Sequence, residues 1–148
     1  MTVERKPRLA MFFRTSTGCV FQAQSTDAGR TWQPAAPINV PNPNTKFHIL
    51  HLSSGLMAMA FNDHKRNQFC KACRTHLHIA VSKDEGVSWR LVARVEEEEG
   101  NGARIHYPTL LQHHNHLLVM YSRFYLDLGG RCRFGKLATC LALSSKNQ

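Results

Sequence analysis

One eight-residue motif occurs twice in this chain and constrains the fold more than any other feature of the sequence. It has the form Ser-x-Asp-x-Gly-x-Thr/Ser-Trp, and its two copies begin 57 residues apart. Repetition over tens of residues is typical of solenoids, propellers and other arrays of one supersecondary unit. The first copy contains Ser25, Asp27, Gly29, Thr31 and Trp32, and the second contains Ser82, Asp84, Gly86, Ser88 and Trp89.

A second repeat overlaps the first. Residues 47–61 align with residues 107–121 at an offset of 60, and Arg14 and Arg74 are separated by the same 60 positions. Three features with nearly equal spacing predict a structural unit of about 60 residues that occurs more than once.

Each unit has the pattern of β-strands. Short runs rich in β-branched and aromatic residues are bounded by turn signals, and no segment has a sustained helical period. Residues 53–55 and 114–115 predict the tight turns of two hairpins. Pro37, Pro41 and Pro43 predict an irregular connection over residues 33–46. The expected strands are residues 9–13, 20–24, 48–52, 56–61, 77–81, 89–95, 109–112, 117–121 and 136–143.

The physical role of the repeated motif is structural. Its aspartate can accept hydrogen bonds from backbone N–H groups two residues further on. Its glycine can adopt the positive φ of a tight turn, and its tryptophan is expected to open the next strand and bury its ring between sheets. The acidic stretch that follows the second copy, residues 96–104, is expected to form a solvated surface loop.

Composition limits the remaining possibilities. The chain has 148 residues, of which 43% are hydrophobic and 20% charged, which suits one soluble domain. No apolar run is long enough for a transmembrane helix, and residues 1–8 lack a secretory signal. We therefore expect a cytoplasmic location by default, with five reduced cysteines.

The net charge is +9, which favours anionic partners. The basic residues are scattered along the chain and no nucleic-acid-binding motif frames them, so no nucleic acid is expected as a partner.

The repeated motif resembles the Asp box of the sialidase (neuraminidase) superfamily, and specifically of BNR/Asp-box repeat proteins. Further segments carry the same resemblance. Residues 11–18 resemble the strand that ends in an arginine before an Asp box, and residues 74–82 resemble another such strand. Residues 40–44 resemble the linker before the next blade, and residues 105–112 resemble the segment that presents a catalytic tyrosine.

The resemblance implies an all-β fold, a partial β-propeller of the sialidase type. One complete four-stranded blade is flanked by two incomplete ones, at about 8–46, 47–95 and 105–143 of a single domain that spans 1–148. A partial propeller exposes strand edges that favour association. We therefore expect either N-terminal blades missing from this chain or an oligomer to close it.

The resemblance also implies an exo-α-sialidase-like site, with a sialylated or other acidic glycan as partner and no cofactor or metal. Arg14 and Arg74 match two of the three arginines that hold the sugar carboxylate, and Tyr107 matches the nucleophile. The third arginine, the acid/base aspartate and the glutamate that activates the tyrosine have no counterpart here. We therefore predict that the isolated chain is an inactive glycoside hydrolase.

Two other functions remain open at this stage. A non-catalytic module could bind an acidic glycan or another protein without cleaving it. Alternatively, Cys70 and Cys73 could form a zinc site with His64, His76 and His78. The site residues also have plain interpretations: Arg14 as a strand-end residue, Arg74 as surface charge and Tyr107 as core filling.

Overall fold

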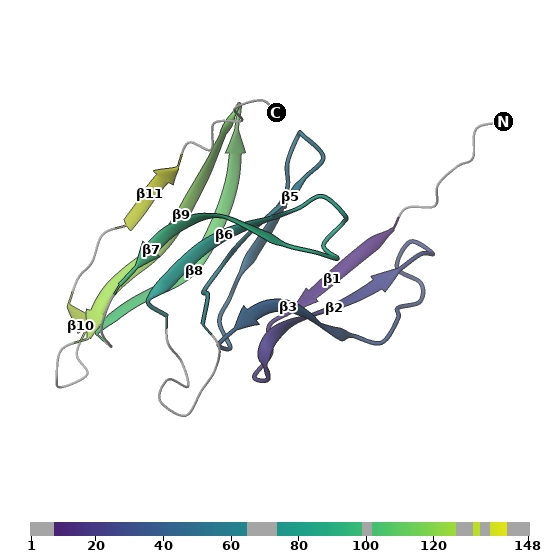
Figure 1. Ribbon diagram of the computed structural model, residues 1–148, viewed down its shortest axis with the longest axis horizontal. Coiled ribbons are helices and arrows are strands. Elements are labelled where there is room, and N and C mark those ends of the chain that lie inside the picture. Colours follow the sequence, from purple (N-terminus) through teal and green to yellow (C-terminus); the bar gives the residue numbers. More distant parts are fainter. Residues whose placement is uncertain (1–7, 65–73, 99–101, 127–131, 134–136, 142–148) are drawn as a thin grey trace.

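A computed structural model describes residues 8–64, 74–98, 102–126, 132–133 and 137–141. These residues form eleven strands and no helix, which confirms the all-β prediction (Figure 1). Each of the nine expected strands is present at least in part, with ends shifted by a few residues, and residues 136, 142 and 143 of the last one lie outside the described residues. The strands are β1 (Leu9–Phe13), β2 (Gly18–Ser25), β3 (Ala36–Asn42), β4 (His48–His51), β5 (Met57–Phe61), β6 (His76–Ser82), β7 (Arg90–Glu97), β8 (Ala103–His113), β9 (His116–Leu126), β10 (Cys132–Arg133) and β11 (Leu137–Leu141).

The strands form three antiparallel sheets in chain order. The first sheet is β1-β2-β3 and the second is β4-β5-β6-β7. In the third sheet β8, β10 and β11 all pair with β9. Figure 1 shows the second sheet between the other two. Each sheet is thus a small meander of neighbouring strands, and the described residues form no closed ring.

The prediction of an irregular connection over residues 33–46 is wrong, because β3 lies within it. Pro37 pairs with Phe21 and Pro41 with Cys19, with a register shift between the two pairs. Strand β3 is at the edge of the first sheet. An edge strand needs only part of its N–H groups for pairing, so it accepts prolines that a central strand would reject.

Part of the acidic stretch is strand and not the loop that the sequence predicts, and its residues 99–101 lie outside the described residues. Glu96 and Glu97 belong to the end of β7, and Ala103 and Arg104 begin β8. The reason lies in β9, where Arg123 binds the carboxylates of Glu96 and Glu98. Paired in this way, the glutamates can lie against the third sheet and remain only partly exposed.

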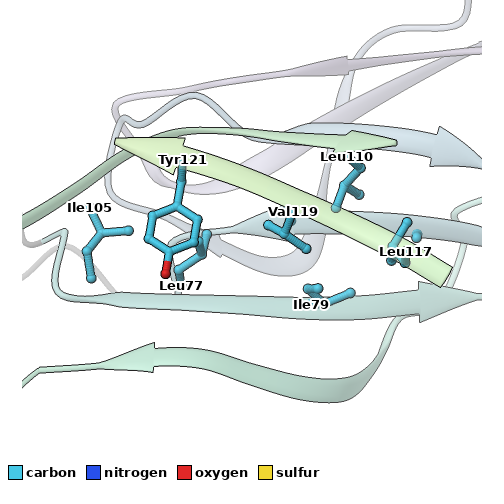
Figure 2. Packing of buried hydrophobic residues seen from close by; sticks show 9 residues of the cluster. Leu77, Ile79, Ile105, Leu110, Leu117, Val119 and Tyr121 are labelled. Atoms are coloured by element: carbon cyan, nitrogen blue, oxygen red, sulfur yellow. The ribbon is translucent and has the colours of Figure 1, made fainter. Parts of the chain in front are cut away.

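Two apolar layers hold the sheets together. The layer between the second and third sheets is shown in Figure 2, where side chains of β6 meet those of β8 and β9. It contains Ala58, Ala60, Leu77, Ile79, Ile105, Leu110, Leu117, Val119 and Tyr121. The layer between the first and second sheets contains Val20, Val40, Met59, Phe61 and Ala80, with Phe12 and Trp89 at its margin.

The described part of the chain contains no helix capable of crossing a membrane.

Candidate functional site

The three residues predicted to form a site lie near one another. Arg14 directly follows β1, Arg74 precedes β6, and Tyr107 lies within β8. Arg74 is partly buried, and this burial lowers the pKa of its guanidinium group. Tyr107 opposes that shift through its charge and a hydrogen bond, whereas the charge of Arg14 adds to it. The plain interpretation of Arg74 as isolated surface charge therefore does not hold.

Sequence reasoning missed a third arginine in this cluster. The charge of Arg104, three positions before Tyr107 on β8, also lowers the pKa of Arg74. The guanidinium of Arg104 donates a hydrogen bond to the backbone oxygen of Ala103 at 2.8 Å. The only sequence signal for Arg104 was its place near the expected tyrosine segment, in a stretch interpreted as a loop.

His106 was also missed, and it positions Arg74. Nη1 of Arg74 lies 2.5 Å from Nδ1 of His106. Because a guanidinium group can only donate, this nitrogen of His106 accepts and the imidazole is neutral. Burial, followed by the charges of Arg74 and Arg104, lowers the pKa of His106 to about 4. His106 therefore orients Arg74 and adds no positive charge at neutral pH.

Tyr107 has an unusual backbone conformation. Its φ is 53°, a left-handed value that is rare for an aromatic residue. The β8–β9 register shifts between His106 and Thr109, so a bulge turns this residue outward. The side chain is 57% exposed, and the plain interpretation as core filling is therefore wrong. Strained positive-φ residues are concentrated at functional sites.

One buried nitrogen in the cluster has no partner. Nε of Arg74 is buried and forms no hydrogen bond, which is uncommon for a buried polar atom. Guanidinium groups match the planar shape of a carboxylate and bind it through two parallel hydrogen bonds. Three arginines beside a phenol thus form a site suited to a carboxylate or another anion.

The two repeated motifs have the same internal hydrogen bonds. Oγ of Ser25 accepts from the backbone N–H of Gly29 at 2.9 Å and donates to Asp27 at 2.8 Å. Asp27 accepts from both the backbone N–H and the hydroxyl of Thr31. The aspartate therefore binds four residues further on, not two as expected.

Ser82, Asp84, Gly86 and Ser88 repeat this arrangement. Hydrogen bonds from Thr31 and Ser88 lower the pKa of Asp27 and Asp84, respectively, to about 2. Ionised carboxylates saturated in this way hold turns and do not transfer protons.

The two tryptophans differ in burial. Trp89 is partly buried against Phe12 and directly precedes β7, as expected. Trp32 is 37% exposed and lies four residues before β3, so the expectation of a buried ring holds for one copy only. In both copies the indole N–H donates to the backbone oxygen of the motif glycine.

Comparison with known families accords with this repeat. The model of the BNR repeat-like domain matches residues 1–120. The chain belongs to the BNR repeat-like domain family. A search of curated proteins finds none that matches it.

This BNR repeat-like domain also contains a cluster of histidines. Nε2 of His64 lies 2.9 Å from Nδ1 of His76 and accepts from the backbone N–H of Thr75 at 3.3 Å. His78 lies between the carboxylates of Asp63 and Glu97, at 2.8 Å and 3.0 Å. Burial, followed by the charge of His76, lowers the pKa of His64 to about 4.

The structure describes only some of the residues proposed for the alternative zinc site. Cys70 and Cys73 lie outside the described residues, and the described ones contain no group of three or more ligands arranged around a metal. These histidines instead connect neighbouring segments. His76 on β6 pairs with His64 after β5, and His78 on β6 pairs with Asp63 after β5 and with Glu97 at the end of β7.

A hollow between the first two sheets of the BNR repeat-like domain is separate from the arginine cluster. It is lined by Arg8, Leu9, Ala10, Gln24, His51, Met57 and Glu85. None of the three arginines of the cluster lines it.

Proposed function

We propose that this BNR repeat-like domain binds the carboxylate of an acidic sugar of the sialic acid type, at a sialidase-like site formed by Arg14, Arg74, Arg104 and Tyr107. The observation that supports it best is the environment of Arg74. This guanidinium is partly buried next to two more arginines and has a buried Nε without a partner. An incoming carboxylate would supply the missing hydrogen bond and offset the repulsion among the three cations.

The chemistry of the neighbours fits an anionic sugar. His106 accepts a hydrogen bond from Nη1 of Arg74 and so fixes the direction of the remaining donors of this guanidinium group. Tyr107 is turned toward solvent beside the guanidinium group. A neutral tyrosine is the nucleophile of sialidases, where a carboxylate nucleophile would face the substrate's own charge.

Turnover by this chain alone is not expected. Within the part of the chain that the structure describes, none of the charged groups that shift the pKa of Arg74 is a carboxylate. General acid and base assistance typically contributes about 10²–10⁴-fold to such reactions. We therefore propose binding without efficient cleavage, in which Arg74 and its neighbours act as a carboxylate clamp.

The test is a titration of the chain with free sialic acid, followed by calorimetry or by amide NMR shifts. We expect saturable binding that is lost with the methyl ester of the same sugar. Arg74→Met and Arg14→Met should weaken binding at least about tenfold, since each removes a charge-assisted contact. Arg90→Met, at an exposed arginine of β7, is the matched control and should bind as the original chain does.

Failure to saturate, or equal binding of the ester, would overturn the proposal. Arg14 is exposed, so its variant keeps the test valid if Arg74→Met does not fold. A fluorogenic α-sialoside tests the catalytic part separately. Turnover that Tyr107→Phe abolishes would show a working sialidase and would refute binding without cleavage.

A further inference from the structure

The first sheet leaves open a face that is covered in the second sheet. In the second sheet β5 pairs with β6 so that Met57 lies opposite Ser82, which begins the second motif. In the first sheet β1 pairs with β2 so that Leu9 lies opposite Ser25, which begins the first motif. The two serines are equivalent, so the strands opposite them are equivalent too. Leu9, Met11 and Phe13 therefore correspond to Met57, Met59 and Phe61.

The exposure of these equivalent residues differs sharply. Met57 and Met59 are 4% and 0% exposed, and Met59 lies in the layer shared with the first sheet. Leu9 and Met11 are both 42% exposed. Trp32, which follows β2 of the same sheet, is exposed, whereas its counterpart Trp89 packs against Phe12 of the preceding sheet. The first sheet thus has the surface that a preceding sheet covers elsewhere in the chain, and no described sheet covers it here.

Among the described residues, no sheet covers the opposite face of the third sheet. Met120 corresponds to Ala60 in the 60-residue repeat, and Ala60 is fully buried against the third sheet. Met120 itself is 43% exposed, and Leu111 on the paired strand is 51% exposed. The chain therefore has at one end the face that a preceding sheet would cover, and at the other end the face that a following sheet would cover.

We propose that two copies of this chain associate head to tail, with the first sheet of each copy packed on the third sheet of the other. Each junction would repeat the packing that already joins consecutive sheets within one chain. Two equal junctions close a ring with twofold symmetry, which satisfies both open faces of both copies. Six sheets fall within the usual range of about four to eight blades in closed propellers.

A second copy is the occupant that the chain's own surfaces favour. Both halves of the junction are present on it, and both consist of sheet faces from the same repeat. The exposed side chains that define them, Met11, Leu111 and Met120, are uncharged. Exposed apolar surfaces of this kind mark association sites in soluble proteins.

Sedimentation velocity of the full chain tests this arrangement. We expect a species of twice the 16.8 kDa chain mass. Met11→Glu and Met120→Glu should each reduce the mass to that of one chain, with the β-sheet circular dichroism retained. Val87→Glu is the matched control, since Val87 is 63% exposed in the second motif and its equivalent in the first motif is Arg30. This control should remain a dimer.

A mixture of the two disrupted variants makes the test sharper. The Met11→Glu chain keeps an intact third sheet and the Met120→Glu chain an intact first sheet, so together they should regain one junction and form a weaker heterodimer. An original chain that stays single at every concentration would overturn the proposal. A dimer that persists in the Met120→Glu variant would also overturn it, because the first sheets of the two copies would then pack on each other. An open polymer in place of a closed pair would overturn it as well.

Discussion

Phe12 and Trp89 pack edge to face, with ring centroids 6.2 Å apart and ring planes at 78°. Phe12 belongs to the first sheet and Trp89 to the second repeated motif, so this contact joins two sheets through a turn. Gly86, the glycine of this turn, lies next to the ring of Phe12. A Cβ atom at Gly86 would lie 2.6 Å from Cζ of Phe12, a distance that side chains essentially never reach without displacement.

Gly86→Ala should therefore destabilise the chain more than replacement of a glycine with similar backbone geometry. Gly55 has φ of +84°, close to the +86° of Gly86, but open space surrounds its missing side chain. We expect Gly55→Ala to cost about 1 kcal/mol in unfolding free energy, from backbone strain alone. Gly86→Ala should cost about 2–4 kcal/mol, because displacement of Phe12 adds to that strain. Urea unfolding of both variants measures the difference, and equal losses would show that Phe12 moves aside freely.

The aspartates of the motifs should make the chain sensitive to strong acid. The folded pKa of Asp84 is about 2, below the ordinary value of 3.8, because Ser88 and Ser82 donate to its charged form. A lowered folded pKa contributes stability above the unfolded pKa and loses it as pH falls through the folded pKa. Melting temperatures should thus fall between pH 4 and about 2. Asp84→Asn should lower the melting temperature at pH 6 and flatten this fall, and an unchanged slope would contradict the assignment.

A separate sensitivity is expected in weaker acid, from the histidines. The folded pKa of His64 is about 4, below the ordinary 6.5, chiefly because of burial. The unfolded chain therefore takes up the proton first, and stability falls as pH drops from about 6.5 toward 4. In the folded chain, protonated His64 could no longer accept from the N–H of Thr75.

His64→Gln keeps an acceptor and removes the titration, so it should reduce this step in melting temperature. His106, also with a pKa of about 4, contributes to the same window. The double variant with His106→Asn should therefore be flatter than either single variant. Melting temperatures measured from pH 7.5 to 4.5 report this effect, because the aspartates take up protons only at lower pH. A step of full size in the double variant would show that other groups cause it.

Local patterns predict most of the fold because strand periodicity and turn residues are local signals. β1 begins and ends at the predicted residues, and the hairpin turn at Gly55 is present. β3 escapes prediction because its prolines are acceptable only on an edge strand, and edge position is a property of the whole sheet. The strand conformation of Glu96 likewise depends on Arg123, which lies 27 residues away.

The candidate site is predictable only through family resemblance. The resemblance to sialidases predicts Arg14, Arg74 and Tyr107. In the structure both Arg14 and Tyr107 are close enough to shift the pKa of Arg74. Arg104 and His106 join them because the β8 strand begins earlier than its local pattern suggests. The outward direction of Tyr107 arises from a bulge in the pairing with β9, and a register shift of this kind has no local sequence signature.

Asn62 should be among the most sensitive polar positions in the chain. Its side chain is fully buried, and its amide nitrogen donates to the backbone oxygens of His76 at 3.0 Å and Ile105 at 3.2 Å. These oxygens belong to the second and third sheets, so one side chain connects both. Asn62→Ala would leave two carbonyl groups without this donor and should cost about 2–4 kcal/mol of unfolding free energy. Asn39→Ala, at an exposed position of β3, should cost less than about 0.5 kcal/mol. Equal effects in urea unfolding would mean that water replaces the amide and that Asn62 does not hold the two sheets together.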